Sequence, residues 1–157
     1  MNFWTWALEA YARPGAAQAC LTLQDDHGQC VPYLLWAAWA AGEGRPIDAS
    51  TLQAGAALAA DWEAAAVGPL RAARRAMKRE VQGMADGARE ALRAEVKALE
   101  LQAEQLLIDA LAAMAPEAGG TALPLAPALA AAAAAWGSDA AGQAFETGLE
   151  RLAQTLS

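Results

Sequence analysis

Apolar side chains recur at intervals of three and four residues along most of the chain, and this spacing is typical of helices with one buried face. Residues 3–13 and 16–27 are predicted to be the first two helices, with Pro14-Gly15 between them and Gly28 ending the second. Residues 31–41 are almost entirely apolar, so they predict a short third helix that is central and buried.

A fourth helix is predicted to begin near Thr51, because Ser50 and Gln53 match a capping box in which each side chain satisfies a backbone donor. Its helical pattern continues to about Met84. Gly68-Pro69 is expected to kink or interrupt it, since proline removes a donor and its ring crowds the preceding turn.

Residues 88–114 form the most amphipathic stretch of the chain and predict a long helix. Residues 116–128 are rich in proline and glycine and predict a linker, and residues 129–157 predict an Ala-rich helical segment whose last helix is capped by Ser138 or Asp139. The apolar stripe of the long helix comprises Leu92, Val96, Leu99, Ala103, Leu106 and the segment from Ile108 to Leu111.

The fold class predicted from these patterns is all-α, a single-domain helical bundle of about six helices, because no segment alternates like a strand. Its core domain is expected at 1–115, with the linker at 116–128 and the C-terminal segment packed on that core. Large side chains gather in the first 40 residues. The aromatic ones either form the densest part of the core, which is the simpler interpretation, or line an apolar ligand pocket: Trp4, Trp6, Tyr11, Tyr33, Trp36 and Trp39.

Composition narrows the classes of function. The net charge of -7 argues against a nucleic-acid partner, and no apolar run approaches the roughly 18 residues that cross a bilayer. The N-terminus lacks the basic region of an export signal, so a cytoplasmic location is expected. Cys20 and Cys30 are expected to be small buried side chains rather than a disulfide.

Charge is unevenly distributed, with eight of the eleven basic residues between Arg71 and Lys97. Four of them follow helical spacing and share one side of a helix: Arg71, Arg74, Arg75 and Lys78. This basic face is either solvated, or paired with acidic helices of the same fold, or a docking surface for an acidic protein or a phosphate-bearing ligand. The leading hypothesis is a non-catalytic helical interaction protein that docks such a partner through this face.

A second polar cluster is Gln24-Asp25-Asp26-His27. Adjacent aspartates hold magnesium in some diphosphate-using helical enzymes, so the alternative hypothesis is a small magnesium-dependent enzyme or binder of a diphosphate metabolite that uses Asp25 and Asp26. Neighbouring side chains on a helix point about 100° apart, and no second acidic motif completes a cage. Capping or surface roles are therefore favoured, no metal or cofactor is expected, and no catalytic motif stands out.

Several elements together resemble a known family. They are the start Phe-Trp-Thr-Trp-Ala-Leu-Glu-Ala-Tyr at 3–11, the element Cys-Leu-Thr-Leu-Gln-Asp-Asp-His-Gly at 20–28, Leu34-Leu35-Trp36, and Pro69-Leu70-Arg71 running into Arg74-Arg75. Over about residues 3–110 the chain resembles a small proteobacterial family of uncharacterised helical proteins, a domain of unknown function. The family's pattern has asparagine where this chain has Pro32. The resemblance implies a helical fold and no particular activity.

Overall fold

A computed structural model describes residues 1–137 and 141–157. In these residues the chain forms eight α-helices and one π-helical turn, and no strand. In chain order the elements are α1 (Phe3–Ala12), α2 (Ala16–Asp25), α3 (Val31–Gly42), α4 (Ala49–Trp62), the π-helical turn η1 (Glu63–Val67), α5 (Gly68–Ala76), α6 (Asp86–Met114), α7 (Leu125–Trp136) and α8 (Gln143–Leu156).

The predicted all-α class is confirmed. The described residues contain more helices than the six or so expected, because α4, η1 and α5 follow one another without a break and are separate elements only by their hydrogen bonding. None of the helices in the described residues combines the length and apolar character needed to span a bilayer.

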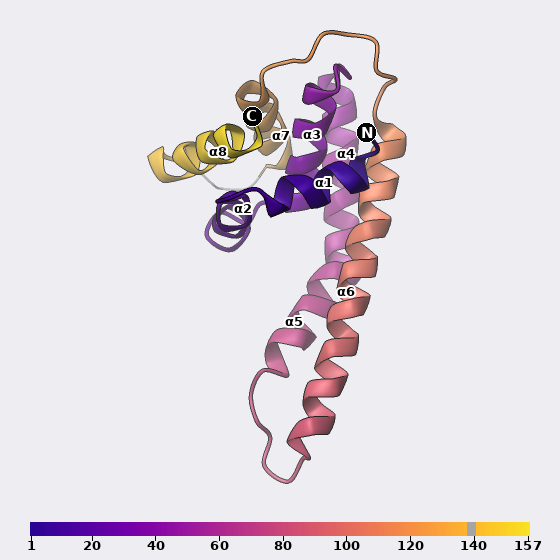
Figure 1. The fold of residues 1–157 in the computed structure, drawn as a ribbon, viewed down its shortest axis with the longest axis vertical. Coiled ribbons are helices and arrows are strands. Elements are labelled where there is room, and N and C mark those ends of the chain that lie inside the picture. The colour runs from indigo at the N-terminus through magenta and orange to yellow at the C-terminus, as the bar shows by residue number, and fades with distance from the viewer. Residues whose placement is uncertain (138–140) are drawn as a thin grey trace.

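Helix α3 is the centre of the molecule, as its apolar sequence predicts. It packs against α1, α4, α6 and α7, so water reaches almost none of its surface (Figure 1). Tyr33 and Trp36 are fully buried, and the Tyr33 hydroxyl donates a hydrogen bond to the Leu52 carbonyl of α4 at 2.9 Å. The aromatic residues of α3 therefore form the core, whereas Trp4 and Trp6 on α1 are only partly covered and Tyr11 is exposed.

Helix α4 begins two residues before the start that the predicted capping box implies. The Asp48 carboxylate accepts from the Thr51 backbone N–H at 2.7 Å and also from the Ser50 hydroxyl at 2.9 Å. The prediction of a Ser50–Gln53 box was wrong because a carboxylate two residues earlier takes the same role and complements the helix dipole better than a hydroxyl.

Gly68-Pro69 does not end the helical rod: the regular α-helix is interrupted by the π-helical turn, and α5 begins at Gly68 directly after it. The N–H of Gly68 donates to the Glu63 carbonyl, which lies five residues back. A side chain at position 68 would approach that carbonyl to 2.8 Å, so glycine is required there. The rod then continues as α5, but it ends at Ala76 and not near Met84 as predicted.

Helix α5 and the N-terminal half of α6 extend beyond the other helices as a hairpin closed by the loop 77–85 (Figure 1). We call this hairpin, residues 68–99, the arm, and the remaining helices the body. Arg89 is the only residue of the arm that is buried. The predicted stripe of α6 is consequently buried only toward its C-terminal end, at Ala103, Ile108 and Leu111, while Leu92, Leu99 and Leu106 stay about half exposed.

The C-terminal helices share the core of the body. Helix α7 packs on α3 and α4, and α8 packs on α2 and α7. Leu129 and Leu152 are fully buried in the same apolar cluster as Trp36. Helix α7 begins at Leu125, inside the range predicted as a linker, and the preceding crossover is tied to the end of α3 by the Leu123 N–H, which donates to the Ala41 carbonyl at 2.8 Å.

The start of the last helix is Gln143, preceded by Gly142. The predicted caps, Ser138 and Asp139, lie outside the described residues.

Gly55 marks the closest approach of α4 to α3. A Cβ atom at this position would lie 2.7 Å from Cζ3 of Trp36 and 3.3 Å from Tyr33. We expect Gly55→Ala to lower the free energy of unfolding by about 1 kcal/mol, because overpacking a core outweighs the gain in helix propensity. Urea unfolding followed by circular dichroism measures the change, and a more stable variant would contradict the close packing.

Candidate functional site

Arg71, the first residue of the predicted basic face, is enclosed by three carboxylates. Its guanidinium lies 2.6 Å from Glu63 on η1, and 3.2 and 3.3 Å from Glu100 and Glu104 on α6. Only 14% of the Arg71 side chain is exposed, so its charge is satisfied inside the fold. The π-helical turn contributes to this arrangement, because it carries Glu63 on the side of the rod that faces α6.

Arg74 joins the same cluster through Glu100, which it shares with Arg71. Burial alone would raise the pKa of Glu100, but the hydrogen bond and charge of Arg74, together with Arg71, outweigh it and hold that pKa below its ordinary value. At Glu104, burial dominates over Arg71 and raises the pKa. The ion pairs of this cluster therefore hold α5 and α6 together at the base of the arm.

The other two residues of the predicted face differ from this pair. Arg75 is 55% exposed and pairs with Asp25 of α2 at 3.1 Å, which links the arm to the body. Lys78 lies past the end of α5 and is exposed, with no carboxylate partner in the described part of the chain. Arg71 and Arg74 are paired inside the fold and Lys78 lies beyond the end of the rod, so the four residues do not form one open cationic surface.

Sequence spacing alone could not identify these partners. The carboxylates come from η1 and α6, and Glu63 and Glu100 are far apart in the chain. The available signal was the pair Glu100 and Glu104, which share one face of a helix by their four-residue spacing. Arg79, which adjoins the basic face in the sequence, is exposed beside Lys78 in the loop 77–85.

The polar cluster of α2 is divided between two places. Asp25 accepts hydrogen bonds from Arg75 and Gln24, and these bonds hold its pKa below the ordinary value. Asp26 and His27 instead line a groove between α2 and α8. In the described residues no three side chains of the His, Cys, Asp and Glu types gather as a metal site would need. The geometry gives the magnesium hypothesis no support.

The two cysteines are free and buried, as expected. Burial raises the pKa of each thiol to about 12. Both side chains therefore stay protonated near neutral pH and act as apolar packing groups.

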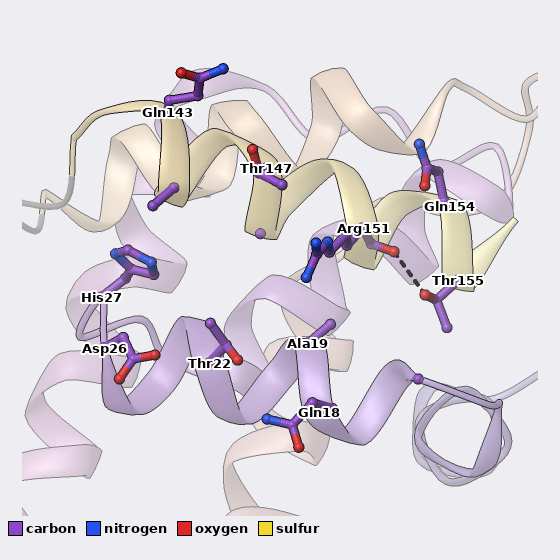
Figure 2. Close-up of a pocket in the computed structure, with 13 residues that line it drawn as sticks. Gln18, Ala19, Thr22, Asp26, His27, Gln143, Thr147, Arg151, Gln154 and Thr155 are labelled. Atoms are coloured by element: carbon purple, nitrogen blue, oxygen red, sulfur yellow. Dashed lines mark hydrogen bonds between the residues drawn. The ribbon is translucent and has the colours of Figure 1, made fainter.

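The groove between α2 and α8 has a volume of about 900 Å³, and polar side chains and small apolar residues line it together (Figure 2). The two helices run in opposite directions, so the C-terminal end of α2 with Asp26 and His27 lies beside the N-terminal end of α8. The His27 ring packs against Phe145 with 5.4 Å between the ring centroids. Arg151 extends from α8 into the space toward α2.

Residues 2–111 match the family model described as a protein of unknown function, DUF2390, and this match covers well over half of the chain. The chain belongs to the DUF2390 family. The membership agrees with the resemblance to an uncharacterised family seen in the sequence. No curated protein and no solved structure matches the chain.

The DUF2390 match contains the whole arm and its ion-pair cluster, together with α1 to α4. It ends within α6, so α7 and α8 lie beyond it. The α2–α8 groove therefore has one wall inside the DUF2390 match and one wall outside it.

Proposed function

We propose that this DUF2390 protein is a non-catalytic interaction protein that binds an acidic partner through the tip of its arm. The observation that carries the proposal is that the arm projects from the body and adds only one buried residue, Arg89, to the fold (Figure 1). A helical hairpin that contributes so little to the core costs conformational entropy that its own packing barely offsets. Binding to another molecule would use the surface that the hairpin leaves exposed.

The tip, residues 77–85, offers both cationic and apolar side chains. Lys78 and Arg79 are exposed and have no carboxylate partner in the described residues. Beside them, Val81 and Met84 are 53% and 57% exposed. Arg71 and Arg74 are compensated by the cluster at the base of the arm, so the proposed docking residues are Lys78 and Arg79, with Arg75 in a secondary role because it already pairs with Asp25.

This combination supports an acidic partner with apolar residues beside its carboxylates. The two cations would steer the encounter, and the exposed Val81 and Met84 would supply apolar area that is lost from water on binding. The cytoplasm of a proteobacterium is the proposed setting, and the two unpaired cysteines support a reducing compartment.

The charge-reversing double variant Lys78→Glu/Arg79→Glu is expected to lose its partner without losing stability. Both side chains are exposed, so the melting temperature should stay within the small range of surface substitutions. The measurement is affinity capture from extract of the native cells, followed by identification of the partner and titration with the purified partner. We expect the affinity to fall by about tenfold or more and to weaken with added salt.

The matched control is Lys97→Glu/Arg151→Glu, which makes the same change in net charge away from the tip. It should retain the partner. Equal loss in both double variants would show that only overall charge matters, and unchanged affinity in the tip variant would refute the proposal.

A further inference from the structure

We propose that the groove between α2 and α8 is a binding site for a small phosphorylated polyol, with Arg151 holding the phosphate group. The site is independent of the arm, and its ligand is a small molecule rather than a macromolecule. The volume of the groove, about 900 Å³, is at the upper end of the range usual for small-molecule sites.

Arg151 is the first reason. The body is strongly acidic and holds only three basic residues. Arg13 donates to the Thr155 carbonyl, and Arg45 donates to a carbonyl of the crossover and lies over the ring of Trp39. Arg151 has no ion pair or side-chain hydrogen bond in the described chain, and its guanidinium extends into the groove (Figure 2). A planar guanidinium whose donors are not used within the described chain can donate two parallel hydrogen bonds to a phosphate.

The second reason is the set of neutral polar side chains around Arg151. They supply amides and hydroxyls that make no side-chain hydrogen bond within the described residues, and both helices contribute to the set: Gln18, Thr22, Gln143, Thr147 and Gln154. A groove that only needed to meet water would not require so many groups able to both donate and accept. Such groups match the hydroxyls of a sugar or other polyol.

The third reason is the polarity of the groove along its length. Asp26 and His27 stand at one end, about two helical turns along α2 from Gln18. The Asp26 carboxylate repels a second anionic group there but accepts hydrogen bonds from hydroxyls. A ligand with its phosphate at Arg151 and its hydroxyls toward Asp26 and His27 satisfies both ends. A ligand charged at both ends does not.

Small residues make the groove possible. Gly148 lets α8 pack close to α2, since a Cβ atom there would lie 3.1 Å from a methyl group of Leu23. Gly15, Ala19 and Ala144 leave space above this contact. The packing of α8 on α2 therefore forms the floor, and the longer polar side chains form the rims.

The test is isothermal titration calorimetry on the full chain with ribose 5-phosphate, glucose 6-phosphate and glycerol 3-phosphate as probes. Ribose, inorganic phosphate and gluconate are the comparison ligands. We expect saturable binding of at least one phosphorylated probe, at least about tenfold tighter than ribose or inorganic phosphate, because each lacks one half of the recognised chemistry. Arg151→Gln should weaken the binding by about tenfold or more, and Thr22→Val by a smaller factor.

Arg79→Gln is the matched control, because it removes the same guanidinium from the exposed tip of the arm. It should bind the probe as the wild type does, and so should the Lys78→Glu/Arg79→Glu variant, which separates this site from the proposed docking function. Circular dichroism checks that Arg151→Gln is folded. The proposal is overturned by no saturable binding at about 10 mM of any phosphorylated probe, by equal affinity in Arg151→Gln, or by gluconate or inorganic phosphate binding as tightly.

Discussion

Replacing Trp36 with alanine is expected to lower the free energy of unfolding by about 4 kcal/mol, the largest loss for any single side chain of this protein. The indole is fully buried on α3, at the point where Gly55 of α4 approaches it most closely. The helices cannot collapse into the space left behind, because Tyr33 and Leu52 hold them together through a hydrogen bond. For a chain of this length the melting temperature should fall by about 10 °C.

The control for Trp36 is phenylalanine. The indole N–H is buried and has no hydrogen-bond partner among the residues that the structure describes, so Trp36→Phe removes an unsatisfied donor together with part of the ring. We expect it to cost roughly half as much as alanine or less. Urea unfolding followed by circular dichroism measures both variants, and a loss below about 1 kcal/mol for Trp36→Ala would show that α3 is not the packed centre of the fold.

Replacing Glu100 with glutamine is expected to lower the free energy of unfolding by about 3 kcal/mol. Its carboxylate pairs with both Arg71 and Arg74, and its side chain is only 8% exposed. The substitution keeps the shape of the side chain but leaves two partly buried guanidinium groups with less negative charge around them. Helix α5 should then separate from α6 at the base of the arm, which hydrogen exchange of α5 backbone amides would detect.

The contribution of Glu100 depends on pH with a definite sign. Because its pKa is lowered in the folded protein, the stabilisation is complete above the ordinary pKa of glutamate and is lost as the pH falls through the lowered value. The difference in unfolding free energy between the wild type and Glu100→Gln should therefore be constant near neutral pH and shrink in acid.

Glu95→Gln is the matched control for Glu100, since Glu95 lies on the same helix, is exposed and has no ion pair in the described residues. It should change stability by less than about 0.5 kcal/mol. Equal effects of the two substitutions would mean that the cluster at the base of the arm contributes nothing specific.

The ion-pair cluster also explains why a basic face is a weak sequence signal for binding. Guanidinium groups at helical spacing satisfy two different requirements, which are pairing with another helix and binding an external anion. In this protein the first use accounts for Arg71 and Arg74, whereas Lys78 and Arg79 have no carboxylate partner among the described residues and are the ones that we propose for the second. The two pairs differ because Arg71 and Arg74 face carboxylates of α6, whereas Lys78 and Arg79 lie in the loop beyond α5.

The sequence by itself determined the helical class, the central place of α3 and the burial of the two cysteines. These features depend on local properties, namely the spacing of apolar residues, the length of the apolar run at 31–41 and the small apolar character of cysteine. Local chemistry also indicated the break after Pro14 and the left-handed glycine at position 28, which has a φ of 61°.

Only the tertiary structure decided which parts of the amphipathic helices are buried. Leu92 and Leu99 repeat at the spacing of a core stripe yet stay exposed, because in the described part of the chain α5 is the helix that packs along this half of α6, and it leaves them uncovered. The same holds for charge and for the groove: Glu100 meets Arg71, and Arg151 lines the same groove as Thr22, through contacts between segments distant in the chain. The periodicity of side chains predicts which residues share one face of a helix. Which helix, if any, covers that face depends on the packing of the whole fold.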